Sequence, residues 1–331
     1  MQKGFDLLDG SKRSKMPEGD TIYRAARALG KVLTGKVVTR FETAYAHLAT
    51  VNDDRPVVGR VIERVEARGK WCLIFFSGDL ILVTHMLMSG SWHIYRTGEK
   101  WWGPKKAARV WLDVDGWQAV GFNIPVAEFH TAASLERKSS VPKLGPDILS
   151  GDYSAQSGLA ALQARKTSHP DDEIANVLLN QRVLAGLGNV YKSEVAFAAR
   201  VHPFRHMSTI TDDEMLQMAD VSQRYMKANV IDNSSETGGD RIITYSGMRR
   251  TTNSANEKNR LWVYGRRGQE CRRCGALIEY RKQGPGARST YWCPECQPWV
   301  PSQQQLAAGA TTTDAPKGWN GAIRRNRVGC S

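Results

Sequence analysis

The sequence has no long apolar run and few cysteines. None of its hydrophobic stretches approaches the roughly 20 residues that a membrane-spanning helix needs. Residues 1–16 are basic but lack the apolar core of a secretory signal. Six cysteines among 331 residues do not indicate a disulfide-rich secreted scaffold, and they fit a reducing compartment. These absences predict a cytoplasmic protein without a membrane partner.

Acidic residues are the scarcer charge, with 33 Asp and Glu against 46 Lys and Arg, which gives a net charge of +13. The excess is concentrated between Arg241 and Arg288, where twelve basic residues face three glutamates. Aromatic residues are interleaved with this stretch: Tyr245, Trp262, Tyr264, Tyr280, Tyr291 and Trp292. A single basic residue is usually only solvated, but so dense a surplus predicts a polyanionic partner, most simply nucleic acid.

Four of the cysteines form two C-x2-C pairs with eighteen residues between them: Cys271, Cys274, Cys293 and Cys296. This spacing is typical of a tetrahedral, all-thiolate zinc site. Two disulfides are the alternative, which is disfavoured because nothing else in the chain looks secreted. The segment between the pairs is a short basic hairpin that cannot fold alone, so one structural zinc would stabilise it. Four thiolates leave no open metal position, so catalysis must lie elsewhere.

The rest of the chain divides into a β half and a helical half. An amphipathic pattern predicts a helix over residues 20–33. Short β-branched and aromatic segments between residues 36 and 122 then predict an antiparallel sandwich or a flattened barrel. After a link at 143–158, helices are expected over 171–181, 189–200 and 211–227. The last of them opens with a capping box, Thr211 to Glu214. The glycine-rich turn at 185–188 would expose N–H groups that favour a phosphate, although an ordinary helical hairpin explains it equally well.

The dipeptide Pro17-Glu18 follows Met16 and looks like a second translation start. Removal of Met16 would leave Pro17 as the N-terminus, with a secondary amine that can attack an aldehyde-like carbon and form an iminium. An internal proline nitrogen is an amide and is inert. The alternative is that Pro17 and Glu18 merely begin the helix. We expect translation to start at Met16, so that residues 1–16 are a leader outside the native protein.

Several separated motifs together resemble the formamidopyrimidine-DNA glycosylase/endonuclease VIII family, over residues 17–297. They are Met16–Thr21 (MPEGDT), Arg68–Trp71 (RGKW), His85–Gly90 (HMLMSG), Leu144–Pro146 (LGP), the run from Leu179 to Tyr191, His202-Pro203 and Val263–Gly268. The resemblance implies an α+β protein: a catalytic two-layer antiparallel β-sandwich with a leading helix (17–145), a helix–two-turn–helix domain (146–260) and a zinc finger (261–299). Residues 300–331 are expected to be a disordered tail. The implied partner is damaged double-stranded DNA in a bacterial nucleoid, bound by a monomer.

The resemblance also implies the roles of individual residues. Pro17 would attack C1′ of the damaged nucleotide, with Glu18 as general acid and base. Lys70 would contact phosphate and assist β-elimination. Asn189 would bind the phosphates that flank the lesion. Arg288, at the tip of the zinc hairpin, would assist δ-elimination, although generic basicity of a hairpin explains it as well.

An extruded base leaves a gap in the duplex, and the resemblance puts Met88 at the family's gap-filling position, with Leu87 beside it. A methionine after a strand is more often part of a core. The stretch 121–126 lacks the paired arginines of 8-oxoguanine-excising relatives, so the chain resembles the endonuclease VIII-like branch more closely. That resemblance implies oxidised pyrimidines as the expected substrates, with 8-oxoguanine or formamidopyrimidine as the alternative. Thr21 stands where some relatives have a second glutamate.

Two other functions are alternatives. One is a protein that binds damaged DNA without catalysis because its proline is blocked. The other is a zinc-ribbon transcription factor, which would leave Pro17-Glu18 unexplained.

Overall fold

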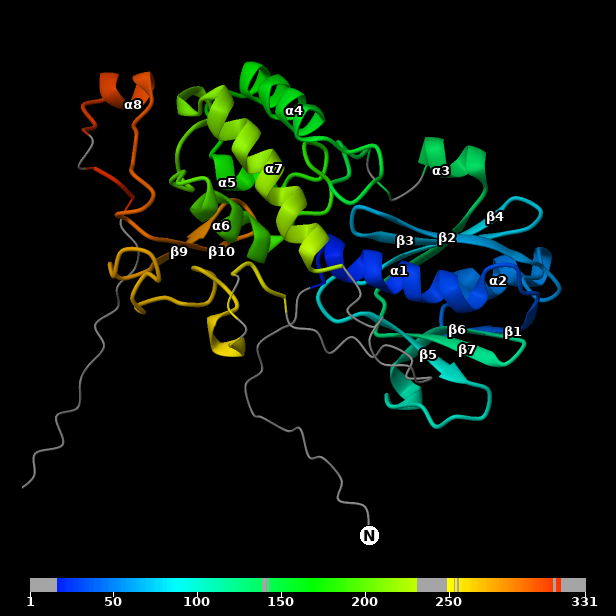
Figure 1. Cartoon of the computed structure of the whole chain (residues 1–331). Coiled ribbons are helices and arrows are strands. Elements are labelled where there is room, and N and C mark those ends of the chain that lie inside the picture. Colours follow the sequence, from blue (N-terminus) through cyan, green and yellow to red (C-terminus); the bar gives the residue numbers. More distant parts are fainter. Residues whose placement is uncertain are drawn as a thin grey trace, which may run out of the picture.

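The computed structural model describes residues 17–138, 141, 143–230, 249–252, 254, 256–311 and 314–316. The expected leader, with Arg241 and Tyr245 of the basic stretch, lies outside the described residues. Two halves lie side by side, and helix α1 (Gly19–Leu33) reaches from their junction into the β half (Figure 1). Within the described ranges, no helix is both long and apolar enough to cross a membrane.

The β half contains two separate four-stranded antiparallel sheets, which confirms the predicted sandwich rather than a closed barrel. The first sheet has the order β1 (Val38–Thr43), β6 (Ala108–Val114), β7 (Trp117–Phe122) and β5 (Ser91–Arg96). The second has the order β2 (Ile62–Arg68), β3 (Trp71–Phe76), β4 (Leu80–His85) and β8 (Val126–His130). Helices α2 (Ala46–Asp54) and α3 (Ala132–Lys138) flank them.

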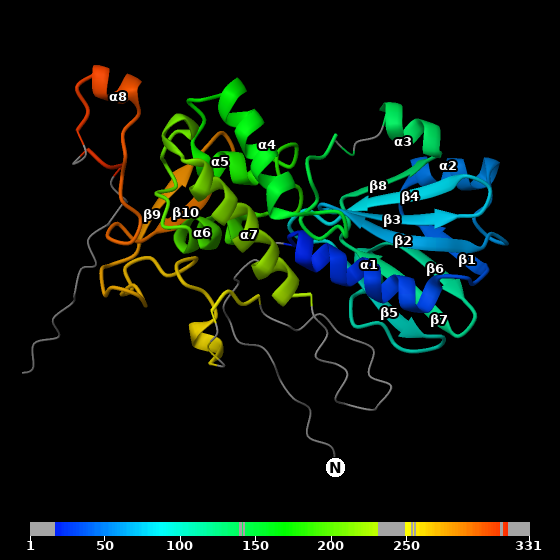
Figure 2. The same cartoon turned by 45° about the horizontal axis from the view of Figure 1, so that its top comes forward.

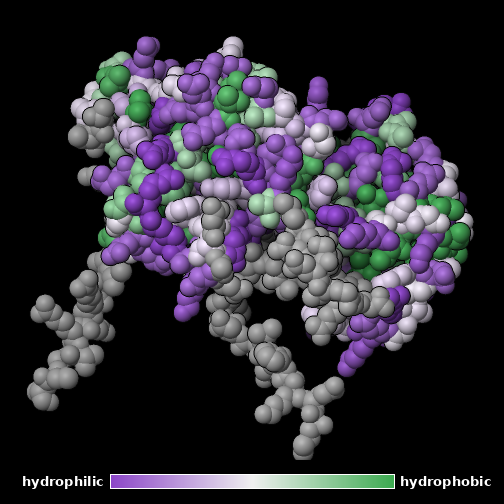
Figure 3. All heavy atoms as spheres, viewed as in Figure 1, coloured by the Kyte–Doolittle hydropathy of each residue, from purple (hydrophilic) through white to green (hydrophobic). Residues whose placement is uncertain are grey.

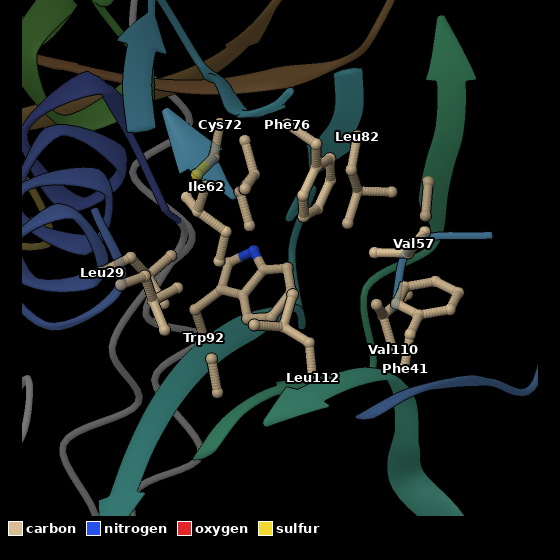
Figure 4. Packing of buried hydrophobic residues seen from close by; sticks show 14 of the residues in the cluster. Leu29, Phe41, Val57, Ile62, Cys72, Phe76, Leu82, Trp92, Val110 and Leu112 are labelled. Carbon is tan, nitrogen blue, oxygen red and sulfur yellow. The ribbon is translucent and has the colours of Figure 1, made fainter. Parts of the chain in front are cut away.

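Trp92 lies at the centre of the sandwich core (Figure 4). Its side chain is 1% exposed and its Nε1 donates a hydrogen bond of 3.2 Å to Thr84 Oγ1. The indole therefore buries its large apolar surface with its polar atom satisfied. The apolar stripe of α1 closes this core with Ile22, Ala25, Ala26, Leu29 and Leu33, as the helical spacing predicts.

The helical half contains α4 (Ala155–Ser168), α5 (Ile174–Leu179), α6 (Asn189–Ala198) and α7 (Asp212–Ala228). Short 3-10 turns lie at Met207–Thr209 (η2) and Glu257–Asn259 (η4). A third, Lys105–Ala107 (η1), belongs to the β half. The predicted capping box is confirmed, because Thr211 Oγ1 accepts from the Glu214 N–H (3.2 Å) and Glu214 Oε2 accepts from the Thr211 N–H (2.9 Å). Hairpin β9 (Glu279–Gln283) and β10 (Arg288–Trp292) packs against the buried helix α6.

Two sequence expectations need correction. Helix α4 begins inside the predicted link, with Ser154 as its cap, and Gly158 fits so closely under Tyr153 that a Cβ there would lie 2.4 Å from the tyrosine oxygen. This helix lacks a clear apolar stripe, so periodicity missed it. The tail was expected to be disordered from residue 300, yet α8 (Gln303–Ala307) forms there behind a Ser302 capping box.

Hydrophilic residues dominate the face in Figure 3, and the hydrophobic ones appear in small groups.

Candidate active site

Glu18 directly precedes α1, and the start of this helix lies at the junction of the two halves (Figure 2). Its carboxylate is 1% exposed, and Oε1 accepts a hydrogen bond from the Val190 N–H (2.8 Å). Oε2 accepts a longer one from the Tyr191 N–H (3.4 Å). Both N–H groups belong to the first turn of α6, where the helix dipole favours a negative charge. A carboxylate of the β half therefore caps a helix of the helical half, directly beside Pro17.

Glycines make this approach possible. A Cβ at Gly188 would lie 2.2 Å from Glu18 Cδ, and a Cβ at Gly19 would lie 2.7 Å from Gly186 Cα. The Gly19 N–H also donates to the Gly186 carbonyl (2.9 Å). The sequence interpretation assigned the N–H groups after this turn to a phosphate. In the structure two of them are bonded to Glu18, so the glycines serve the contact between the halves.

Lys70 lies on the turn between β2 and β3. The charges of Glu18, Arg288 and Arg249 are close enough to change the pKa of its amine. Burial, with a further contribution from Arg288 and Arg249, lowers the pKa of Lys70 to about 8, although Glu18 opposes the shift. The turn is held from the linker, because the Gly69 N–H donates to Asp147 Oδ2 (2.6 Å). Asp147 thus positions the lysine turn, a role that its place after the Leu-Gly-Pro motif did not reveal.

Arg249 and Asp20 form a buried ion pair that sequence reasoning missed. Arg249 Nη2 lies 2.7 Å from Asp20 Oδ1, its Nε donates to Oδ2 (2.9 Å), and its Nη1 lies 3.8 Å from Glu18 Oε1. Tyr191 Oη also donates to Asp20 (3.1 Å). Burial alone would raise the pKa of Asp20, but the guanidinium outweighs it and lowers that pKa. No local pattern relates two residues 229 positions apart.

Asn189, Leu87 and Met88 surround the same junction with different exposures. Asn189 is 4% exposed and donates to Tyr264 Oη (3.3 Å), while its Oδ1 has no hydrogen-bond partner among the described residues. Leu87 and Met88 are 47% and 46% exposed, and Leu87 has φ of +45°. Met88 is therefore not a core residue; the buried methionine of this turn is Met86. Arg288 is exposed at the first position of β10.

Lys192 is a buried cation that the sequence interpretation did not single out. It lies on α6, is 0% exposed, and its Nζ has no hydrogen-bond partner within the described part of the chain. Burial, and next the charge of Arg288, lowers the pKa of Lys192 to about 7, against the opposing effect of Glu173 and Glu18. A charged residue between Tyr191 and Ser193 gives no sign of burial, because most lysines are exposed.

We expect Lys192→Met to raise the free energy of unfolding, by a few kcal/mol at neutral and acidic pH. Because the folded pKa is near 7 and the unfolded value near 10.5, the unfolded chain binds more protons between these limits. The gain should therefore be full below about pH 7 and vanish towards about pH 10.5. Urea denaturation across this range measures it. Lys31→Met on the exposed side of α1 is the control, and an equal gain there would contradict the explanation.

The four hairpin cysteines converge as predicted. Their sulfurs all lie within 4.8 Å of one another, with Cys271 and Cys296 3.9 Å apart and Cys274 and Cys293 3.4 Å apart. These separations are far longer than a disulfide bond of about 2.05 Å. A tetrahedral ion with bonds of about 2.3 Å would hold sulfurs about 3.8 Å apart, which the cluster matches. The N–H groups of Arg273 and Cys296 donate to the sulfurs of Cys271 and Cys293, each over 3.4 Å. The residues fit a structural metal ion.

Comparison with known proteins agrees with this architecture. Residues 16–125 match the formamidopyrimidine-DNA glycosylase N-terminal domain, and residues 144–239 match the formamidopyrimidine-DNA glycosylase H2TH domain. The chain is 36% identical to a "Probable endonuclease 8 2" of Streptomyces coelicolor over 85% of this chain and 94% of that protein. It is 34% identical to the "DNA-(apurinic or apyrimidinic site) lyase Nei2" of Mycolicibacterium smegmatis, over 85% and 99% of the two chains.

Among solved structures, Lactococcus lactis Fpg in complex with DNA that contains an abasic site has the same fold. The TM-score is 0.67 at 24% identity, and the match covers 85% of this chain and 99% of that one. The matched domains together span most of the chain, in the order that the sequence motifs predict. The protein belongs to the formamidopyrimidine-DNA glycosylase/endonuclease VIII family.

Proposed function

We propose that this protein is a bifunctional DNA glycosylase and abasic-site lyase of base excision repair. The observation that carries the proposal is the position of Pro17-Glu18, which lies at the junction of the two halves within the electrostatic reach of Lys70 and Arg249. The names of the relatives, endonuclease 8 2 and abasic-site lyase, support it. In this proposal residues 17–145 form the catalytic domain, and damaged duplex DNA binds against both halves.

The chemistry begins at the Pro17 nitrogen, which must be a secondary amine and therefore the N-terminus. The amine attacks C1′, the C1′–base bond breaks, and the base leaves with a proton. Glu18 supplies and accepts the protons as the sugar ring opens. The resulting iminium withdraws electrons, so that loss of a C2′ proton breaks the C3′–oxygen bond. Loss of a second proton then breaks the C5′–oxygen bond, and water releases the sugar fragment from Pro17.

Lys70 and Arg288 assist these eliminations in our proposal. A pKa of about 8 leaves a substantial fraction of Lys70 neutral near physiological pH, so it can accept a proton as well as contact phosphate. Arg288, exposed on the zinc hairpin, binds the phosphate that leaves in the δ-elimination. Asn189 binds the phosphates that flank the lesion through its side-chain amide nitrogen, which donates to Tyr264 Oη in the free protein. The half-exposed Leu87 and Met88 fill the gap left by the extruded nucleotide.

Oxidised pyrimidines are the substrates that we favour. The turn after β7 carries no paired arginines; Asn123 has φ of +47°, and Ile124 is 0% exposed. A buried isoleucine cannot contact the base opposite an extruded lesion. This turn therefore cannot do what the paired arginines of 8-oxoguanine-excising relatives do. The relatives named endonuclease 8 2, at 33–36% identity, support the endonuclease VIII-like branch. We further propose that the ion held by the four cysteines is zinc, because all-thiolate tetrahedral sites select it.

Borohydride trapping tests the proposal. Wild-type protein should form a covalent adduct with duplexes containing thymine glycol, dihydrouracil or an abasic site, and less with 8-oxoguanine. Glu18→Gln should lower single-turnover base excision by about 10²- to 10⁴-fold, because the acid/base group is lost. The glutamine can still accept the Val190 N–H, so the fold should persist, as circular dichroism would verify.

A non-catalytic damaged-DNA binder is the second candidate, because a blocked Pro17 would leave the basic surface intact. Such a protein would bind the same duplexes without forming an adduct. Absence of any adduct from a preparation whose mass begins at Pro17 would rule out the lyase proposal.

A further inference from the structure

The loop between β5 and β6, residues 97–107, covers the outer face of the first sheet (Figure 1). Trp101 from this loop packs on Tyr95, Trp111 and Phe122, with ring centroids 6.4, 5.9 and 5.8 Å apart. Its Nε1 donates a hydrogen bond to Gln118. These contacts form a small aromatic cluster separate from the main core, and they anchor the loop to the sheet.

Trp102, the next residue, points the other way. It is 72% exposed, the highest value among the exposed large hydrophobic side chains of the described residues. Its backbone is fixed, because the Trp102 N–H donates to Tyr95 Oη (3.2 Å) and Gly103 packs so tightly on Phe122 that a Cβ would lie 2.8 Å from the ring. The indole is therefore presented to solvent on an anchored backbone, and a tryptophan so placed has its π-face available for a partner.

Basic residues flank this indole along the chain. Lys100, Lys105 and Lys106 are exposed on the same loop, and Arg96 is exposed at its start. Glu99 is the one acidic residue between positions 96 and 109, and its Oε2 accepts the Arg96 N–H (2.9 Å). A polyanion is the partner that such a surface attracts. We call residues Lys100, Trp102, Lys105 and Lys106 the loop 97–107 surface; the Arg96 guanidinium lies over the Trp117 ring, 3.9 Å from its centroid, and is not part of it.

The last residues of the loop, 105–107, lie at the same end of the sheet as the turn that carries Leu87 and Met88. The Asn123 N–H donates to the Ala107 carbonyl (2.8 Å), and Phe122 pairs with Ser91, which directly follows that turn. The lysines at 105 and 106 therefore continue the surface that begins at the exposed Leu87 and Met88.

We propose that the loop 97–107 surface is a second nucleic-acid site that binds single-stranded DNA, with a base stacked on Trp102 and phosphates on the neighbouring lysines. A single strand fits better than a duplex, since an indole face stacks only on a base that is free of its own neighbours. The lysines neutralise the backbone without reading sequence. The site requires no chemistry at Pro17 and uses no residue of the proposed active site.

Fluorescence anisotropy with a labelled oligothymidine and with a labelled lesion-free duplex tests the site. Trp102→Ala should weaken oligothymidine binding about 5- to 100-fold, the range of one lost base stack, and change duplex binding less than about twofold. Trp102→Phe should retain most of the affinity because a ring remains. Lys105→Glu should weaken oligothymidine binding and flatten its salt dependence, whereas Lys31→Glu on α1, with the same change of charge, should do neither.

Unchanged oligothymidine binding in Trp102→Ala would overturn the inference and leave the surface to another kind of partner, such as an acidic protein. An equal loss for duplex and single strand would also overturn it, because the surface would then only extend the duplex site. Borohydride trapping on a lesion duplex is measured in parallel. Loss of trapping in the wild type would refute the proposed function without affecting the oligothymidine result, so the two failures are distinct.

Discussion

Protein that retains any residue before Pro17 is expected to give no borohydride-trapped adduct, whereas protein that begins at Pro17 is trapped on lesion duplexes. The reason is chemical, because a residue ahead of Pro17 converts its amine to an amide with no nucleophilic lone pair. The two forms of the protein differ only in the residues before Pro17. The duplex affinity and melting temperature of one form can therefore be compared directly with those of the other. Intact-mass analysis of each preparation, together with gel quantification of the adduct, gives the measurement.

Pro17→Gly, with Met16 removed, is the informative control. Glycine supplies a primary amine that can also form an imine, so some trapping should remain. Trapping by a preparation whose mass shows retained upstream residues would show that another amine attacks the sugar. Lys70 would then be the first candidate, because a lysine with a pKa of about 8 is a competent nucleophile.

Removal of the metal is expected to unfold the cysteine hairpin and abolish δ-elimination. The hairpin is short and largely exposed, and a structural zinc contributes about 10–16 kcal/mol to comparable modules. Without it, Gln283 would lose its hydrogen bonds to Glu173 (2.8 Å) and to the Pro203 carbonyl (3.0 Å), which dock β9 on the helical half. Arg288 would lose its position with them. The β-elimination product should accumulate in place of the δ product.

Cys274→Ser provides the test without a chelator. It should lower the bound metal well below one ion per chain and lower the melting temperature, as elemental analysis and thermal denaturation would report. Cys72→Ala is the matched control, since Cys72 lies in β3 within the sandwich core and outside the cluster. A metal-free Cys274→Ser protein with unchanged melting and an intact δ product would show that the hairpin does not depend on the ion.

The sequence predicted those parts of the fold whose signals are local. The stripe of α1, the strands between residues 62 and 122, the Thr211 capping box and the cysteine pairs each follow from neighbouring residues, and all are confirmed. The family resemblance was carried by motifs that the comparisons confirm. The pairing of Asp20 with Arg249, the burial of Lys192 and the hold of Asp147 on the Lys70 turn could not be predicted, because each depends on how distant segments meet.

The glycine-rich turn makes a contact that its sequence did not predict. Its sequence suggested a phosphate cradle, because free N–H groups at a helix start attract anions. In the structure the carboxylate of Glu18 accepts hydrogen bonds from two of these N–H groups. The side chain fits there only because Gly188 has no Cβ. The anion is the protein's own, and it comes from 172 residues away.

This distance has a consequence for the newly made chain. Pro17 and Glu18 leave the ribosome early, but the helix that receives the carboxylate follows much later, and Arg249 later still. Domains tend to fold in order of synthesis, so the sandwich can form while Glu18 still lacks the N–H groups of α6 and the Arg249 guanidinium that surround it, and the proposed active site is incomplete. A nascent or truncated polypeptide would then be unable to cut chromosomal DNA, and nuclease competence would arise only when translation is nearly complete.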